Sequence, residues 1–369
     1  MSRHTSPANA GMAILAVCGL LPLYGQAQEI ESAPQDRNER EFVFDLSGGV
    51  GWTDNVTRAP VNAEEATFAA AGVRILFDEQ RRRLEASLDA SMQFYSYFED
   101  EFEDDYRGGF TGSLNLALIP ERFEWVVEND FGQIRVDPFD ASTPENRENF
   151  NYFTTGPNLA IGLGSASVLR LFGRYSDSRY EDLNALDGNR RSAGLELSRQ
   201  TSPGRGLSLN AVTERVEYEG TAVQDGIEFD RHQAFISLQG RGSRTELRLD
   251  LGYSVMDDGI NESEGTVARI AMTRAVSSRS SVTLGGGRGF SDAGDWFREV
   301  QGRNGPDLEG ARILATPDPF ENTFGYFEWF FSFHRTGFGV GVDFNRERYE
   351  TSPELDREMF TYSLFAERE

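Results

Sequence analysis

The sequence of 369 residues contains no lysine and a single cysteine, Cys18. Without lysine, the chain cannot form a Schiff base or a Walker-type phosphate loop, because both need an ammonium group. One cysteine excludes a disulfide within the chain and a cysteine-based metal site. Basic residues are also few, because the chain has 36 arginines and 60 acidic residues, which gives a net charge of −24. This acidic surplus argues against nucleic acid as a partner, because no basic field would displace the counterions of its phosphates.

Long apolar runs are missing as well, since no segment has the roughly 18–20 consecutive apolar residues of a membrane-spanning helix. Near the start, Arg3 precedes a short apolar stretch over residues 12–23. Small residues follow this stretch, the last of them Ala27. This order is typical of a secretory signal peptide, so we expect residues 1–27 to be one and to be removed. Residues 28–41 are then a polar periplasmic leader. An N-terminal membrane anchor is the alternative interpretation.

The rest of the chain alternates between apolar and polar residues. In residues 82–94, apolar side chains at even positions from Leu84 to Phe94 alternate with polar side chains at odd positions, and residues 245–255 and 338–347 repeat the pattern. A helix would spread these residues around its circumference, whereas a strand places all the apolar ones on one face. With thirteen weaker segments, the alternation predicts sixteen strands.

The predicted connections between these strands alternate between short and long. Short periplasmic turns at one rim and long extracellular loops at the other are typical of outer-membrane barrels. The expected strand length of about 10–13 residues fits a membrane strand of roughly 9–11 residues better than a β-sandwich strand of about five or six. We therefore predict an all-β, transmembrane antiparallel β-barrel of about sixteen strands over residues 42–369, in the Gram-negative outer membrane. Its expected interface aromatics are Trp52, Trp125, Trp329 and Tyr253.

If the apolar phase of each strand faces lipid, the polar phase lines the lumen. The candidate lumen-lining residues are Glu85, Asp89, Glu128, Asp130, Arg170, Arg174, Glu246, Arg248, Asp250 and Asp343. Sixteen strands leave an aqueous channel, and acidic residues exceed arginines on this phase, so we expect a cation-preferring pore at low salt. The alternative is that these charges pair across strands and only satisfy a wet interior. The segment 291–322 is long enough to fold inward, and its candidate constriction residues are Trp296, Arg298, Arg303 and Asp307.

Other chemical signals are weak. The acidic run within residues 97–106 could collect divalent cations near lipopolysaccharide, but it lacks an EF-hand spacing, and a solvated acidic loop is the favoured interpretation. After residue 27 the only histidines are His232 and His334, and no spacing links either of them to a serine and an acid. We therefore predict no enzyme, no cofactor and no metal site. No plug-sized N-terminal domain precedes the strands, which disfavours a TonB-dependent transporter.

Several stretches resemble outer-membrane porins of the beta-barrel porin 2 type. They are GVGWTDNV at 49–56, RFEW at 122–125, FGQ at 131–133, DPF at 137–139 and TGP at 155–157. Related barrels are found beside exopolysaccharide and PEP-CTERM sorting genes. The resemblance implies an outer-membrane barrel that serves polysaccharide export and offers no catalytic residues. One departure is the chain end, FAERE at 365–369, because such barrels usually finish on an aromatic residue.

Three functions follow as hypotheses. The first is a porin-like channel for polar solutes or an extracellular polysaccharide. The second is a structural or adhesive surface barrel with a closed lumen, and the third, an outer-membrane enzyme, rests on His232 alone. The partners expected with the barrel are outer-membrane lipid and lipopolysaccharide, the barrel-assembly machinery and polysaccharide-export components.

Overall fold

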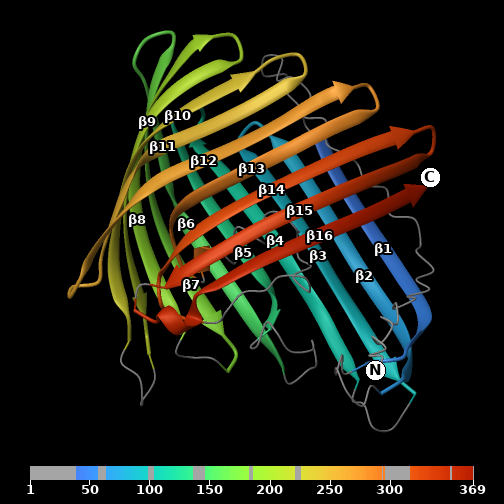
Figure 1. Ribbon diagram of the computed structural model, residues 1–369. Coiled ribbons are helices and arrows are strands. Elements are labelled where there is room, and N and C mark those ends of the chain that lie inside the picture. The colour runs from blue at the N-terminus through green and yellow to red at the C-terminus, as the bar shows by residue number, and fades with distance from the viewer. Residues whose placement is uncertain are drawn as a thin grey trace, which may run out of the picture.

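The chain folds into one sixteen-stranded antiparallel sheet, as the computed structural model shows (Figure 1). It describes residues 39–56, 64–98, 104–135, 146–182, 186–220, 226–292, 294–295, 316–349 and 351–368. The strands are β1 (Glu39–Thr53), β2 (Ala66–Arg81), β3 (Leu84–Tyr97), β4 (Asp105–Ile119), β5 (Phe123–Arg135), β6 (Arg147–Gly162), β7 (Ser167–Tyr180), β8 (Gly188–Ser202), β9 (Arg205–Tyr218), β10 (Glu228–Arg241), β11 (Thr245–Asp257), β12 (Glu262–Ser277), β13 (Ser280–Ser291), β14 (Phe320–Phe333), β15 (Thr336–Tyr349) and β16 (Arg357–Arg368). The prediction of sixteen antiparallel strands is confirmed.

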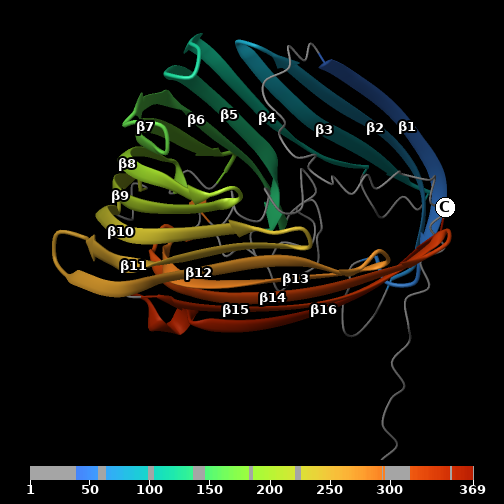
Figure 2. The same ribbon diagram turned by 90° about the horizontal axis from the view of Figure 1, so that it is seen from above.

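Each strand pairs with its neighbours in sequence, and the sheet curves round on itself (Figure 2). Within the described residues, β1 and β16 form no ladder with each other, so the sheet keeps two edges. A short 3-10 helix, η3 (Pro353–Leu355), lies between β15 and β16. Among the described residues, no helix has the length and hydropathy of a membrane span.

The connections form two classes at the two ends of the strands. The turns at 82–83, 203–204, 278–279 and 334–335 hold two residues each. Two of them contain a residue in the left-handed region, Gly204 (φ 72°) and His334 (φ 58°), which lets the chain reverse over so short a span. The connections at the other end are longer, as in 136–146 and 292–319.

Two expected boundaries differ from the structure. We expected a long loop over residues 256–265, but β11 and β12 extend into it and leave only 258–261 as the turn. The side chain of Asp258 accepts hydrogen bonds from the backbone N–H groups of Ile260 (2.8 Å) and Asn261 (2.6 Å), which closes this hairpin tightly. At the other end of the sheet, β1 begins at Glu39, inside the segment expected to be a leader.

The two faces of the sheet have opposite chemistry. Exposed aliphatic side chains share one face, and the strand register aligns Leu197, Leu209, Ile236 and Leu251 in one row across β8–β11. Buried polar and charged side chains, among them Arg190, Glu214 and Arg231, occupy the other face. Arg190 on β8 contacts residues that follow β13, which is five strands away in the sheet. Side chains from strands so far apart can meet only across the inside of the curved sheet. The polar face is therefore concave and the aliphatic face convex.

Candidate functional site

A buried ion-pair network on the concave face joins three strands to the segment that follows β13. The guanidinium of Arg190 binds Glu214 (Nη1–Oε1 3.0 Å), Asp295 (Nη1–Oδ1 2.6 Å) and Asp292. Arg231 binds the same Glu214 oxygen (Nη2–Oε1 2.6 Å) and the second oxygen of Asp295 (Nη2–Oδ2 2.6 Å). We call these five residues the anchor network. It ties the start of a long connection to the wall of the sheet.

The strand register places the three wall residues of the anchor network together. Arg231 on β10 stands directly opposite Glu214 on β9, so their side chains share the concave face at van der Waals range. Arg190 lies on β8 two positions before Ser192, which is the partner of Glu214. All three lie toward the end of their strands that carries the long connections. The network therefore sits near one rim, not at mid-strand.

The segment after β13 enters this cluster through short local contacts. The backbone N–H of Asp295 donates to the carboxylate of Asp292 (2.9 Å), and Arg231 donates to the carbonyl of Phe290 (Nη1–O 2.9 Å). Gly294 lies so close to the wall that an added Cβ would be 3.4 Å from the ring of Tyr152 and 3.5 Å from Arg190. Phe290, Asp292, Gly294 and Asp295 thus lie against β6, β8 and β10.

Burial makes the anchor network energetically important. Asp292 is fully buried, and Arg190, Glu214 and Arg231 are each less than a tenth exposed. Each of these charges has lost most of its hydration, so each depends on its partners. Removing one partner from a buried pair costs about 3–5 kcal/mol, because it leaves the other charge uncompensated. The loss of any one member of the network is therefore expected to be costly.

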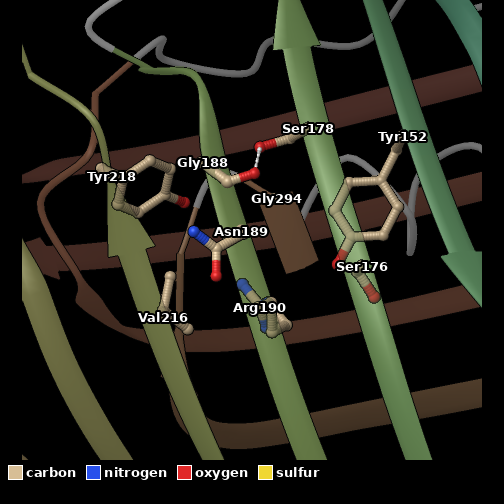
Figure 3. A pocket seen from close by; sticks show the side chains of 9 residues that line it. All are labelled: Tyr152, Ser176, Ser178, Gly188, Asn189, Arg190, Val216, Tyr218 and Gly294. Carbon is tan, nitrogen blue, oxygen red and sulfur yellow. Dashed lines mark hydrogen bonds between the residues drawn. The ribbon is translucent and has the colours of Figure 1, made fainter.

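Aromatic and aliphatic side chains surround the anchor network. A buried cluster of Val216, Tyr218, Phe229, Met256 and Phe290 lies beside it, on β9, β10, β11 and β13. A small cavity of about 10 Å³ also lies there, lined from β6–β9 and by Gly294, and it has room for about one water molecule (Figure 3). The concave face is thus closely packed at this level.

A second buried carboxylate lies on β15. Glu347 is completely buried and accepts two hydrogen bonds from Arg357 on β16 (Nε 2.6 Å, Nη2 2.9 Å). The hydroxyl of Tyr349 and the amide of Asn345 also donate to it, each at 2.8 Å. This arrangement fastens the start of the last strand to its neighbour.

The ten residues that we expected to line the lumen all share the concave face with Arg190, by the register of the strands. Five of them form ion pairs: Asp89 with Arg74 (2.8 Å), Arg170 with Glu196 (3.0 Å), Glu246 with Arg241 (2.8 Å), and Arg248 with Asp250 (3.3 Å). Arg174 donates to the side chain of Asn158 (2.6 Å). Pairing across or along strands is therefore common on this face.

The four residues expected at the constriction, Trp296, Arg298, Arg303 and Asp307, lie outside the described residues. The described start of the same connection, Asp292 and Asp295, is what the wall binds. None of the five residues of the anchor network was among the ten candidate lumen-lining residues, although alternation along β8–β10 puts Arg190, Glu214 and Arg231 on the inward phase. The available signal was two acids three positions apart, Asp292 and Asp295, directly after a predicted strand.

The two histidines after residue 27 lie on different parts of the sheet. His232 lies on the convex face, where its Nδ1 is 2.8 Å from the hydroxyl of Thr213. His334 lies in the two-residue turn before β15. The described part of the chain holds no group of three or more histidine, cysteine, aspartate or glutamate side chains arranged to hold a metal ion.

No protein-family model matches the chain, and no curated protein matches its sequence. Solved structures with a similar fold include the FrpB iron transporter from Neisseria meningitidis, with 9% identity, a TM-score of 0.46, and coverage of 91% of this chain and 61% of that one. The copper transporter OprC has 11% identity and a TM-score of 0.44, with coverage of 89% and 62%. The siderophore receptor PirA from Pseudomonas aeruginosa has 12% identity and a TM-score of 0.41, with coverage of 91% and 62%. The chain thus spans about three fifths of each of these structures.

Proposed function

We propose that the protein is an outer-membrane channel whose bore is narrowed near the long-connection rim by the segment that the anchor network holds. The observation that carries this proposal is the division of the curved sheet into an exposed aliphatic convex face and a charged concave face. A water-soluble protein rarely exposes a continuous aliphatic belt, whereas a barrel in lipid requires one.

Two further features support a membrane location. Trp125 and Trp329 lie near the short-turn ends of β5 and β14, partly exposed, and each donates its indole N–H to a hydroxyl, of Thr155 (2.8 Å) and Ser280 (2.9 Å). Tryptophan at this level is typical of the membrane interface. Trp52 and Tyr253, both exposed on the convex side, lie toward the opposite ends of their strands.

In a membrane, the backbone N–H and C=O groups at the two edges of the sheet need hydrogen-bond partners. Unpaired backbone groups in lipid cost several kcal/mol each, so no open edge is stable there. The alternating strand directions make β1 and β16 antiparallel to each other. Our proposal therefore includes pairing of β1 with β16 in the membrane, which would complete a closed barrel of sixteen strands.

The proposal also covers the class of solute that the channel transports. The concave face is rich in carboxylates and arginines, and its charged rows suit small polar solutes, cations in particular. The resemblance to beta-barrel porin 2 proteins favours an extracellular polysaccharide and export components as partners. Gram-negative origin, the signal peptide over residues 1–27 and the barrel-assembly machinery are part of this proposal.

A closed-lumen barrel is the second candidate, and a specific observation favours it. Concave side chains near the long-connection rim, such as Phe150, Phe229 and Glu347, are almost completely buried. Single-channel recording of the purified protein in planar bilayers separates the two functions. A channel gives discrete conductance steps. If neither the wild type nor a variant with residues 296–315 deleted conducts, the protein is a closed structural barrel.

A further inference from the structure

A groove crosses the convex face of the sheet over β2–β5, away from the anchor network. It encloses about 410 Å³, within the range of about 300–1,000 Å³ that is usual for ligand pockets. Its walls are apolar and include Val73, Ile75, Met92, Phe110 and Phe131. The groove is therefore large enough and apolar enough for a ligand.

Small residues on adjacent rows of the sheet make the floor of the groove. Gly108 stands opposite Met92 in one row, and Ala90 stands opposite Phe110 in the next. A Cβ on Gly108 would lie 2.8 Å from the carbonyl oxygen of Ser91, so this position cannot carry a side chain without moving the backbone. The groove is therefore fixed by backbone packing and not by a movable side chain.

The walls of the groove are rigid as well. The rings of Phe110 and Phe131 stack with their centroids 5.8 Å apart and their planes 21° from parallel. Met92 and Tyr106 stand on the groove's borders and are about half exposed. A flexible thioether beside fixed rings suits a long, unbranched apolar ligand.

One end of the groove is polar. The amide of Gln133 donates to the side chain of Asn149 (Nε2–Oδ1 3.0 Å) and to the carbonyl of Tyr106 (3.3 Å). Tyr106 and Asn149 lie in the first three residues of β4 and β6, at the long-connection rim. The apolar part of the groove continues from these amides toward the middle of β2 and β3.

We propose that this groove binds one acyl chain of lipopolysaccharide, with the sugar end of the lipid beside Gln133 and Asn149. The proposal rests on the outer-membrane location proposed above, in which the long connections face outward. The outer leaflet is then the source of the ligand, and its lipid carries acyl chains below a hydroxyl-rich head group. The apolar walls match the chain and the amide pair matches the head.

The test is lipid binding by the purified protein in detergent, read by native mass spectrometry with synthetic hexa-acylated lipid A as the probe. Ala90→Leu fills the floor of the groove, and Ala86→Leu makes the same change on the same strand and face, outside the groove lining. We expect the wild type and Ala86→Leu to bind lipid A equally, and Ala90→Leu to lose most of that binding. Phosphatidylethanolamine added as a competitor should not displace lipid A.

Equal binding by all three proteins, or displacement by phosphatidylethanolamine, would overturn the proposal. If Ala90→Leu does not fold, Phe110→Ala removes a wall and should also lower lipid A occupancy relative to Ala86→Leu. Wild-type insertion into bilayers is measured separately. Normal insertion without lipid A binding contradicts this inference alone, whereas failure to insert contradicts the proposed location.

Discussion

Arg190 on β8 and Asp292 after β13 are 102 positions apart in the chain and form a buried ion pair across the inside of the curved sheet. Asp292 is completely buried and pairs with Arg190, and this pair therefore fixes where the connection after β13 begins. Asp295 also binds both Arg190 and Arg231, so the segment after β13 is attached to the sheet through more than one residue. The start of this connection is thus attached to the wall of the sheet.

The first prediction concerns stability. Arg190→Gln should lower the free energy of unfolding by about 3–5 kcal/mol, because Asp292 stays buried after losing its ion pair with Arg190. Arg170→Gln on the same face should cost no more than about 1 kcal/mol, since its pair with Glu196 is exposed. Urea unfolding in detergent micelles measures both. Similar losses for the two variants would show that burial does not govern these pairs.

The second prediction concerns the convex face. Ile236→Arg places a charge in the aliphatic row near the middle of β10 and should destabilise the protein in bilayers by about 2–4 kcal/mol. Gln233→Arg, three residues away on the concave face, should have little effect. Folding yield into phosphatidylcholine vesicles across a urea series gives both values. Equal tolerance of the two arginines would mean that the convex face does not meet lipid.

The third prediction concerns the two edges of the sheet. The side chains of Leu46 on β1 and of Phe360, Tyr362 and Leu364 on β16 share the convex face. If the edges pair in the membrane, Leu46→Cys should form a disulfide with a cysteine at one of those three β16 positions, because opposed residues on one face approach to about 5 Å. Gel mobility after mild oxidation reports the bond.

The controls for this edge experiment come from the known register. Leu46→Cys with Val73→Cys tests a pair already opposed in β1 and β2, and it should cross-link fully. Leu46→Cys with Thr361→Cys or Ser363→Cys joins opposite faces and should not. Cross-linking between molecules, in place of a bond within one chain, would contradict closure by β1 and β16.

The fourth prediction concerns ion preference. Glu128 lies mid-strand on the concave face, and Glu128→Gln should reduce the preference for cations at 0.1 M salt. Asp250, the other mid-strand acid, is a poorer test because it is buried beside Arg248. Glu264→Gln, on the convex face, should change nothing. Reversal potentials in a salt gradient decide this, and an anion-selective wild type would contradict the assignment of faces.

The same recording should depend on salt concentration. The screening length falls from about 10 Å at 0.1 M to about 3 Å at 1 M, so carboxylates on the wall lose their influence over the bore. We expect the preference for cations to fade toward 1 M in the wild type and to be weak at both concentrations in Glu128→Gln.

Strand number and facing could be predicted from the sequence because both depend on a local period of two. The phase of Leu84–Phe94 alone fixes which side chains of β3 share a face. The turn at 258–261 was misjudged because polar residues such as Glu262 and Glu264 continue a strand beyond its apolar part. Glu262 pairs with Asp257 and Glu264 pairs with Val255, and these pairs set where β11 ends and β12 begins. No local pattern of hydropathy predicts this pairing.

The anchor network could not be predicted because it depends on the curvature of the whole sheet. The facing of Glu214 and Arg231 follows from alternation, and their pairing follows from a hairpin register. The contact of Arg190 with Asp292 requires β8 and β13 to approach each other across the concave side, which no local pattern encodes. Arg190 shares the phase of Glu196 on β8, so its facing follows from alternation, and only its partners could not be predicted.

The measurement that tests the central claim most directly is the single-channel conductance of three proteins in planar bilayers at 1 M salt. They are the wild type, the double variant Asp292→Asn, Asp295→Asn, and Gly294→Leu, which removes the close fit against Tyr152 and Arg190 without changing charge. If the anchored segment narrows the bore, both variants should conduct more than the wild type, and by similar amounts. Unchanged conductance in both, with normal folding, would contradict a channel restricted by this segment.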